Sequence, residues 1–224
     1  MIPWEFLGSA QASADGEVLS LYRRGEEFSI RVKGRQLMDS TVHGSEDALA
    51  ELACARLARR PSCRVLIGGL GLGYTAAAAL RQLGPRSQVV VAELVPAVVE
   101  WNRGVLGHLA GHPLDDPRTT VRVVDVAAIL RQEQDAYDAI LLDVDNGPVG
   151  LTRRGNTWLY AQVGLAAAHA ALRPHGVLAV WSAGPDRPFV RRLQRLGFAV
   201  EEVMVRARGN RGGRQHIVWL AERA

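Results

Sequence analysis

Carboxylates stand at the ends of successive apolar runs in this sequence of 224 residues. Glu93, Asp125 and Asp143 each follow or close such a run, and Asp145 comes two positions later. A carboxylate can accept hydrogen bonds from hydroxyl and amino groups, or take a proton as a general base. Open α/β sheets bind ligands at the carboxyl ends of their strands, so we expect these acids to share one site.

Each of these acids also has a purely structural interpretation. Asp125 precedes a predicted helix and can serve as its N-cap, a role compatible with ligand binding. Glu93 could be a solvated strand end, and Asp143 and Asp145 could open an Asx turn into residues 146–148. Because two acids spaced by two on a strand face the same side, we favour a functional role for the pair.

A glycine-rich turn precedes Glu93. Residues 65–75 read Val-Leu-Ile-Gly-Gly-Leu-Gly-Leu-Gly-Tyr-Thr, and an alanine-rich helical segment follows. A strand, a glycine turn and a helix N-terminus together form a nucleotide cradle, in which Gly69, Gly71 and Gly73 would lie against the ligand. The turn alone also fits a nicotinamide dinucleotide site or a plain corner between a strand and a helix.

Strand-like runs alternate with helical segments through most of the chain. We expect strands at about 64–68, 88–93, 119–124, 138–143 and 176–182, and helices at about 73–83, 95–104, 126–132, 157–172 and 187–196. This alternation is typical of a parallel sheet with helices on both faces. Two last strands, at about 198–205 and 215–220, have no helix between them and should pair antiparallel. The predicted fold class is therefore α/β: a doubly wound, mostly parallel seven-stranded sheet that ends in an antiparallel hairpin.

The N-terminal part predicts a small β structure of its own. Alternating apolar residues across 17–39, with turns at Gly25 and Gly34, predict a meander of two or three antiparallel strands. Ser45 then opens a predicted helix as its N-cap, and this helix runs to about Arg59. We divide the chain into an N-terminal β appendage at 1–44 and an α/β domain at 45–224, against which the appendage must pack.

The charged residues of the sequence bear on whether the protein binds nucleic acid. Lys and Arg number 27 against 23 Asp and Glu, a net charge of +4 that permits an acidic partner without demanding one. The arginines at 206, 208, 211 and 214 lie in the last predicted hairpin, where a solvated loop is the better interpretation and a phosphate site the alternative. We therefore expect no nucleic-acid partner.

Membrane and metal sites are not expected either. No apolar run approaches the roughly 18–20 residues of a membrane span, and no signal peptide is evident, so we expect a cytoplasmic protein. Cys54 and Cys63 lack metal-ligand spacing, and glycines and a proline around His108 and His112 argue against the helix that a zinc pair would need.

Five strand–helix units closed by a hairpin, with a glycine turn and acids at successive strand ends, resemble the class I S-adenosylmethionine-dependent methyltransferases. Within that superfamily, residues 17–205 are most similar to the spermidine synthases. The segment 137–143 resembles their Y-D-x-I-x-x-D, residues 148–150 resemble the P-x-G that follows it, and residues 156–160 resemble their next helix start. His43 and Glu46 lie where that family has an adjacent His-Glu pair.

This resemblance implies a ligand and roles for the site residues. The ligand would be S-adenosylmethionine or its decarboxylated form, bound by Gly69, Gly71, Leu72, Gly73, Glu93, Asp125 and Asp143. Of these, Glu93 would bind the ribose diol and Asp125 the adenine amino group. Asp143 and Asp145 would be catalytic. A small-molecule acceptor, for which an amine is one alternative, would contact His43, Glu46 and Tyr160, although capping or core packing also explains His43 and the aromatic residues.

Two departures from the spermidine synthases favour methyl transfer. Leu72 stands where that family carries an acid that would repel the carboxylate of intact S-adenosylmethionine. The segment after Asp143 is one residue longer, which shifts Asp145 relative to the family's base. Three alternatives stay open: aminopropyl transfer from the decarboxylated donor, a nicotinamide-dependent oxidoreductase, and a non-catalytic nucleotide-binding protein. A homodimer is one alternative for the assembly.

Overall fold

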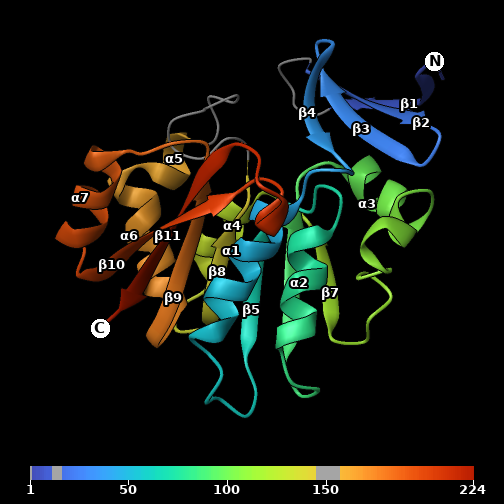
Figure 1. The fold of residues 1–224 in the computed structure, drawn as a ribbon. Coiled ribbons are helices and arrows are strands. Elements are labelled where there is room, and N and C mark those ends of the chain that lie inside the picture. The colour runs from blue at the N-terminus through green and yellow to red at the C-terminus, as the bar shows by residue number, and fades with distance from the viewer. Residues whose placement is uncertain (1, 12–16, 145–156) are drawn as a thin grey trace.

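A seven-stranded sheet forms the centre of the protein in a computed structural model that describes residues 2–11, 17–144 and 157–224 (Figure 1). Its strands are β5 (Arg64–Gly68), β6 (Gln88–Glu93), β7 (Thr119–Val123), β8 (Tyr137–Leu142), β9 (Leu172–Ser182), β10 (Phe198–Arg206) and β11 (Gln215–Arg223). They lie in the order β10-β11-β9-β8-β5-β6-β7. The strands β5 to β9 run parallel, and β11 pairs antiparallel with both β9 and β10. The predicted fold class is confirmed.

Helices cover both faces of this sheet. One face packs on α1 (Gly44–Ala55), α2 (Tyr74–Gln82) and α3 (Pro96–Arg103), and the other on α4 (Val126–Gln132), α5 (Thr157–Tyr160), α6 (Gln162–Ala171) and α7 (Arg187–Arg195). The described residues also include two short 3-10 helices, η1 (Gly107–Ala110) and η3 (Gly209–Arg211). Side chains of a strand alternate between the two faces. In β5, accordingly, Val65 and Ile67 join one core cluster and Leu66 joins the other.

A second, antiparallel sheet contains β1 (Glu5–Gln11), β2 (Val18–Arg24), β3 (Glu27–Val32) and β4 (Arg35–Asp39), in that order. It has four strands rather than the predicted two or three, because a register shift between Phe6 and Gly8 interrupts the alternation that would have marked β1. Leu21 and Ile30 of this sheet belong to the same buried cluster as Val98 of α3. The sheet therefore packs on the α/β domain beside α3, above the carboxyl ends of the central strands (Figure 1).

Two helix boundaries differ from the sequence-based expectation. The helix expected at 157–172 is divided at Ala161, whose backbone is extended, and β9 begins directly after α6. The helix expected from Ser45 to Arg59 is α1, which ends at Ala55 and whose N-cap position is His43. The Gly44 N–H donates to the Ala207 carbonyl oxygen at 2.9 Å, so α1 begins directly against the loop of the last hairpin. In the described ranges, no helix is long and apolar enough to cross a membrane.

Asp138, the first acid of the segment 137–143, lies at the start of β8, at the opposite end of the strand from the expected ligand site. It is 2% exposed and accepts hydrogen bonds from the Arg64 backbone N–H at 2.7 Å, from the Arg173 guanidinium at 2.8 Å, and from Arg60. These bonds connect β8 to β5, to β9 and to the loop before β5, so Asp138 has a structural role.

Replacing Asp138 should destabilise the fold. We expect Asp138→Asn to lower the free energy of unfolding by about 3 kcal/mol, because the amide leaves a buried donor and two arginines poorly matched. Urea unfolding measures this loss. Asp135→Asn is the matched control: Asp135 pairs with Arg223 on the surface, its side chain is 61% exposed, and Asn tolerates its positive φ. Equal losses in the two variants would contradict the assignment.

Candidate active site

The glycine turn between β5 and α2 lets three parts of the chain meet. Gly69 (φ 92°), Gly71 (φ 54°) and Gly73 (φ 87°) all have left-handed backbones. A Cβ on Gly69 would lie 2.5 Å from the carbonyl oxygen of Asp143, and one on Gly71 would lie 3.0 Å from Met38 Sδ. The turn thus requires glycine where it approaches the end of β8 and the N-terminal sheet.

The residues of this turn face two directions. Gly69 and Gly71 line a pocket, whereas the side chains of Leu70 and Leu72 are buried in the hydrophobic core. Leu72 is only 1% exposed, so its side chain does not line the pocket that the sequence-based expectation assigned to it. Gly73 does not line the pocket either; it occupies the N-cap position of α2.

Glu93 and Asn102 hold the turn in place. Glu93 accepts hydrogen bonds from the Leu70 N–H at 2.9 Å and, through its other oxygen, from the Val95 N–H at 2.8 Å. Asn102 of α3 donates to the Gly71 carbonyl oxygen at 2.9 Å. Each carboxylate oxygen has a second lone pair, so Glu93 can still accept from a ligand hydroxyl. Sequence reasoning missed Asn102, whose only signal is a polar residue on the buried side of α3.

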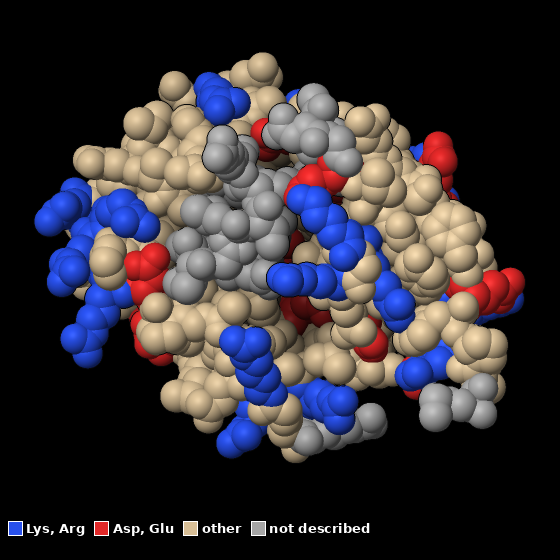
Figure 2. All heavy atoms as spheres, turned by 90° about the horizontal axis from the view of Figure 1, so that it is seen from above, with Lys and Arg blue, Asp and Glu red and all other residues tan. Residues whose placement is uncertain are grey.

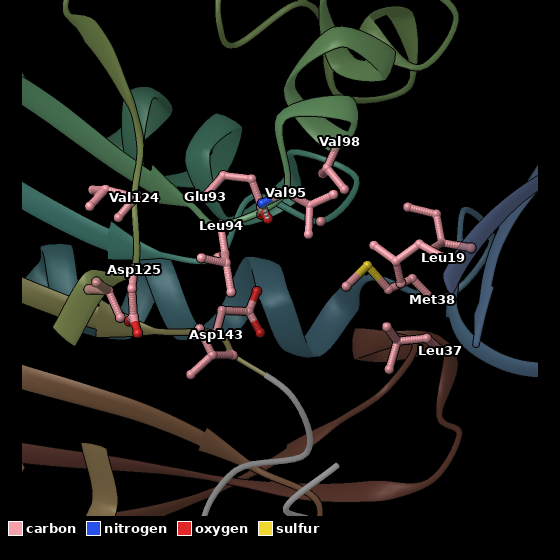
Figure 3. Close-up of a pocket in the computed structure, with 16 residues that line it drawn as sticks. Leu19, Leu37, Met38, Glu93, Leu94, Val95, Val98, Val124, Asp125 and Asp143 are labelled. Carbon is pink, nitrogen blue, oxygen red and sulfur yellow. Dashed lines mark hydrogen bonds between the residues drawn. The ribbon is translucent and has the colours of Figure 1, made fainter. Parts of the chain in front are cut away.

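We call the cavity beside this turn the glycine-turn pocket (Figure 3). Leu37 and Met38 of the N-terminal sheet lie on one side of it and Asp125 on the other, with Glu93 and Asp143 between them. Asp125 also accepts a hydrogen bond from the Ala127 N–H at 2.8 Å, so its predicted N-cap role is confirmed. The predicted acids at the ends of β6 and β8 and at the start of α4 do meet in one place.

A second cavity of about 380 Å³, the hairpin pocket, adjoins the first. It shares Leu37, Met38, Gly71 and Asp143 with the glycine-turn pocket. Its further lining includes Ser45 and Glu46 of α1, Trp181 at the end of β9, and Arg214 and His216 of the last hairpin. The volume lies within the range of small-molecule sites. Asp143 therefore stands at the junction of two pockets.

Two of the carboxylates that line these pockets, Asp143 and Glu46, are held where the ionised form is disfavoured. Burial raises the pKa of Asp143, and a 2.6 Å hydrogen bond from the Thr75 hydroxyl opposes that rise. Burial raises the pKa of Glu46 well above its ordinary value, and the charges of Asp143 and Asp47 raise it further. A raised carboxylate pKa is typical of groups that exchange protons. Thr75, which sequence reasoning missed, is the residue that holds Asp143.

His43 and Tyr160 do not reach these pockets. His43 contacts Asp47 at 2.6 Å, stacks on Tyr74, and lines a separate groove, so its expected pairing with Glu46 is wrong. Tyr160 is 3% exposed and donates to the Val144 carbonyl oxygen at 3.1 Å, so it supports the chain after β8, and its expected contact with an acceptor stays a prediction.

Two expectations concern what the site contains beyond these residues. Asp145 lies outside the described residues, so its catalytic role stays a prediction. Within the described ranges, no group of three His, Cys, Asp or Glu side chains could hold a metal ion.

Removing the charge of Glu93 should loosen the glycine turn. An amide has one donor end and cannot accept from both N–H groups, so we expect Glu93→Gln to weaken binding of the adenosyl donor by about 1.5–3 kcal/mol, roughly 10- to 100-fold. Calorimetric titration with S-adenosylmethionine and its decarboxylated form measures this change. Glu100→Gln, on the exposed side of α3, is the control, and unchanged affinity for both donors in Glu93→Gln would refute the role.

Glu46 should lower stability at high pH. Its folded-state pKa lies above the ordinary value of 4.5, so the folded state binds its proton more tightly than the unfolded chain, and the associated stability disappears as pH rises through the folded pKa. We therefore expect Glu46→Gln to be more stable than the wild type at pH 8, with the difference vanishing below about pH 4. Chemical denaturation at several pH values tests this. The exposed Glu51→Gln on α1 should show no such pH-dependent gain.

The similarity of this chain to known proteins includes the motifs of the site. Residues 56–188 match the family model described as Spermine/spermidine synthase domain, a range that takes in the glycine turn and the acids at 93, 125 and 143. The polyamine aminopropyltransferase of Mycobacterium tuberculosis is 34% identical over 167 residues, which cover 73% of this chain and 30% of that protein. Putrescine N-methyltransferase 2 of Nicotiana tabacum is 33% identical over 116 residues, which cover 51% of this chain and 31% of that protein. The chain thus spans about 30% of the length of these curated relatives.

A solved structure supports the architecture. The spermidine synthase from Thermotoga maritima superposes with a TM-score of 0.76 at 18% identity, over 98% of this chain and 73% of that one. At this identity the likeness shows the fold alone, including the N-terminal sheet and the final hairpin. The family model, in contrast, matches more than half of the sequence. This chain belongs to the spermine/spermidine synthase family.

Proposed function

We propose that this chain transfers an aminopropyl group from decarboxylated S-adenosylmethionine to an amine. The glycine-turn pocket would hold the donor and the hairpin pocket the acceptor. The observation that carries the proposal is Asp143, a carboxylate with a raised pKa at the junction of the two pockets. Membership of the family, and the similarity to a relative named polyamine aminopropyltransferase, support it.

The glycine-turn pocket suits an adenosyl group. Gly69 and Gly71 leave its wall free of side chains, and Glu93 and Asp125 offer acceptors for ribose hydroxyls and an adenine amino group. Leu94, which directly follows β6 and is 45% exposed, offers an apolar surface to the base. These features fit the ligand that the sequence resemblance implies.

The charges at the junction favour a donor without a carboxylate. Asp143 and Glu46 repel the carboxylate in the tail of the intact donor and attract the ammonium, which the tail of the decarboxylated donor presents alone. Methyl transfer from the intact donor was preferred from the sequence because of Leu72 and of the longer segment after Asp143. The Leu72 side chain faces the core, and most of that segment lies outside the described residues. We therefore place aminopropyl transfer first.

Asp143 has the position of a general base. The bound donor supplies an electrophilic carbon beside a positively charged sulfur and a thioether leaving group. An acceptor amine is protonated at neutral pH, and ionised Asp143 takes its proton. The freed nitrogen lone pair forms the N–C bond while the C–S bond breaks and its electron pair stays on sulfur. Thr75 orients Asp143, and Glu46 attracts the cationic acceptor.

A second candidate is N-methylation of the same amine, favoured by the similarity to a relative named putrescine N-methyltransferase 2. It uses the same proton transfer to Asp143 and differs in which carbon on sulfur is attacked. The product mass separates the two reactions.

Asp143 provides the direct test. With decarboxylated S-adenosylmethionine and putrescine, we expect aminopropylated product, detected by mass spectrometry, and a kcat/KM that rises with pH along a limb above the ordinary aspartate pKa of 3.8. Asp143→Asn should lower kcat/KM by roughly 10²- to 10⁴-fold and remove that limb, with a larger loss in kcat than in donor affinity. Asp115→Asn, a surface variant, is the control.

The outcomes separate the candidates. A methylated product formed only with the intact donor would establish the second reaction in place of the first. Absence of any product and of donor binding, with both donors, would refute both.

A further inference from the structure

We propose that the acceptor of this chain carries a carboxylate as well as its amine, and that Arg214 binds this carboxylate. The proposal rests on the proposed function, since it concerns the pocket assigned there to the acceptor. It depends on how unpaired charges are distributed within the hairpin pocket.

One wall of the hairpin pocket offers acceptors that lack a cation. Glu46 forms no side-chain hydrogen bond or ion pair with the part of the chain that the structure describes, and no cation contributes to its pKa. From the described residues, the Asp143 carboxylate accepts a single hydrogen bond, which the neutral hydroxyl of Thr75 donates. Asp39, the third acid in the lining, is already satisfied by the backbone N–H and hydroxyl of Thr41 at 2.8 and 2.6 Å. An ammonium group is what Glu46 and Asp143 lack.

The wall formed by β9 and the last hairpin offers donors that lack an acceptor. The Arg214 side chain is exposed and forms no ion pair or hydrogen bond with any described residue, and Arg214 is the one arginine or lysine in the described lining. Burial and the charge of Arg214 lower the pKa of the neighbouring His216, so His216 adds no second cation at neutral pH. The Trp181 indole N–H also has no acceptor among the described residues. Because this nitrogen is buried, Arg214 is the donor that the open pocket presents directly.

The surface shows the same arrangement. Seen from above the strand ends, basic side chains gather around the central hollow and acidic atoms lie within it (Figure 2). Arg206 and Arg208 line the separate groove on the outer side of α1, which also contains His43, so they do not share the pocket of Arg214. The basic loop that the sequence suggested as a solvated segment therefore has one member facing a ligand site.

A carboxylate on an amine fits this charge pattern. The planar guanidinium matches a carboxylate through two parallel hydrogen bonds, and one fixed cation balances one negative charge. A plain diamine would instead bring its second ammonium toward Arg214, a like charge. The carboxylate belongs to the acceptor because Arg214 lines the hairpin pocket and not the glycine-turn pocket.

Ornithine and putrescine are a matched pair for the test, because ornithine is putrescine with one added carboxylate. Calorimetry measures the binding of each amine to the full chain. Transfer from decarboxylated S-adenosylmethionine is then measured with both amines in competition. We expect the wild type to prefer ornithine by at least about 10-fold in both assays, the scale of one charge-assisted pair. Arg214→Gln should reduce this ratio at least about 10-fold, and Arg214→Lys should retain part of it.

Arg206→Gln is the control, because it removes an exposed arginine from the same hairpin but from the other groove, and its ratio should equal that of the wild type. A wild type that binds putrescine as well as ornithine, or a preference that survives in folded Arg214→Gln, overturns the proposal. So does an Arg214→Gln variant that changes only the discrimination between intact and decarboxylated donors. Ornithine binding that depends on Arg214 without transfer to either amine supports the carboxylate site and refutes the proposed reaction.

Discussion

The backbone of the glycine turn is the constraint on which the site depends. Gly69 has no space for a Cβ because the carbonyl oxygen of Asp143 lies there, and Gly71, whose φ is 54°, lies against the Met38 side chain. Since peptide groups in such a turn are left without partners in the adjoining helix, Glu93 and Asn102 bind them from β6 and α3. The turn therefore connects β5, β6, β8 and the N-terminal sheet around one cavity, and a side chain at either glycine would separate them.

The buried carboxylates at the two ends of β8 have different partners. At the start of β8, Asp138 is surrounded by arginines and a backbone N–H, and its charge is compensated within the protein. At the other end of the same strand, and among the described residues, Asp143 accepts one hydrogen bond, from the Thr75 hydroxyl, and Glu46 lies near it without a cation. The contacts of Asp138 stabilise the protein at the start of the strand. At its carboxyl end, the ionised forms of Asp143 and Glu46 are disfavoured, and such carboxylates can bind a cation and accept its proton.

The acceptor side of the site comes from segments far apart in the sequence. The start of α1 contacts the loop between β10 and β11 because Gly44 has no side chain and its N–H donates to Ala207. This contact brings Glu46 and the hairpin residue Arg214 into one pocket, while His43, three positions before Glu46, lines the opposite side of the helix start. The geometry thus separates two residues that the sequence resemblance placed together and joins two that it left unconnected.

The sequence alone determined the α/β architecture, the antiparallel final hairpin, the glycine turn and the acids Glu93, Asp125 and Asp143, because these depend on local patterns: apolar runs, helix periodicity, and backbone positions that only glycine tolerates. It did not determine β1, whose alternation is interrupted by a register shift, or the direction of Leu72, whose side chain turns to the core. The roles of Thr75, Asn102 and Arg214 were decided only by the tertiary structure. Each depends on a contact or a shared cavity between segments distant in the chain, and no local pattern in a single sequence encodes which side chains meet across such distances.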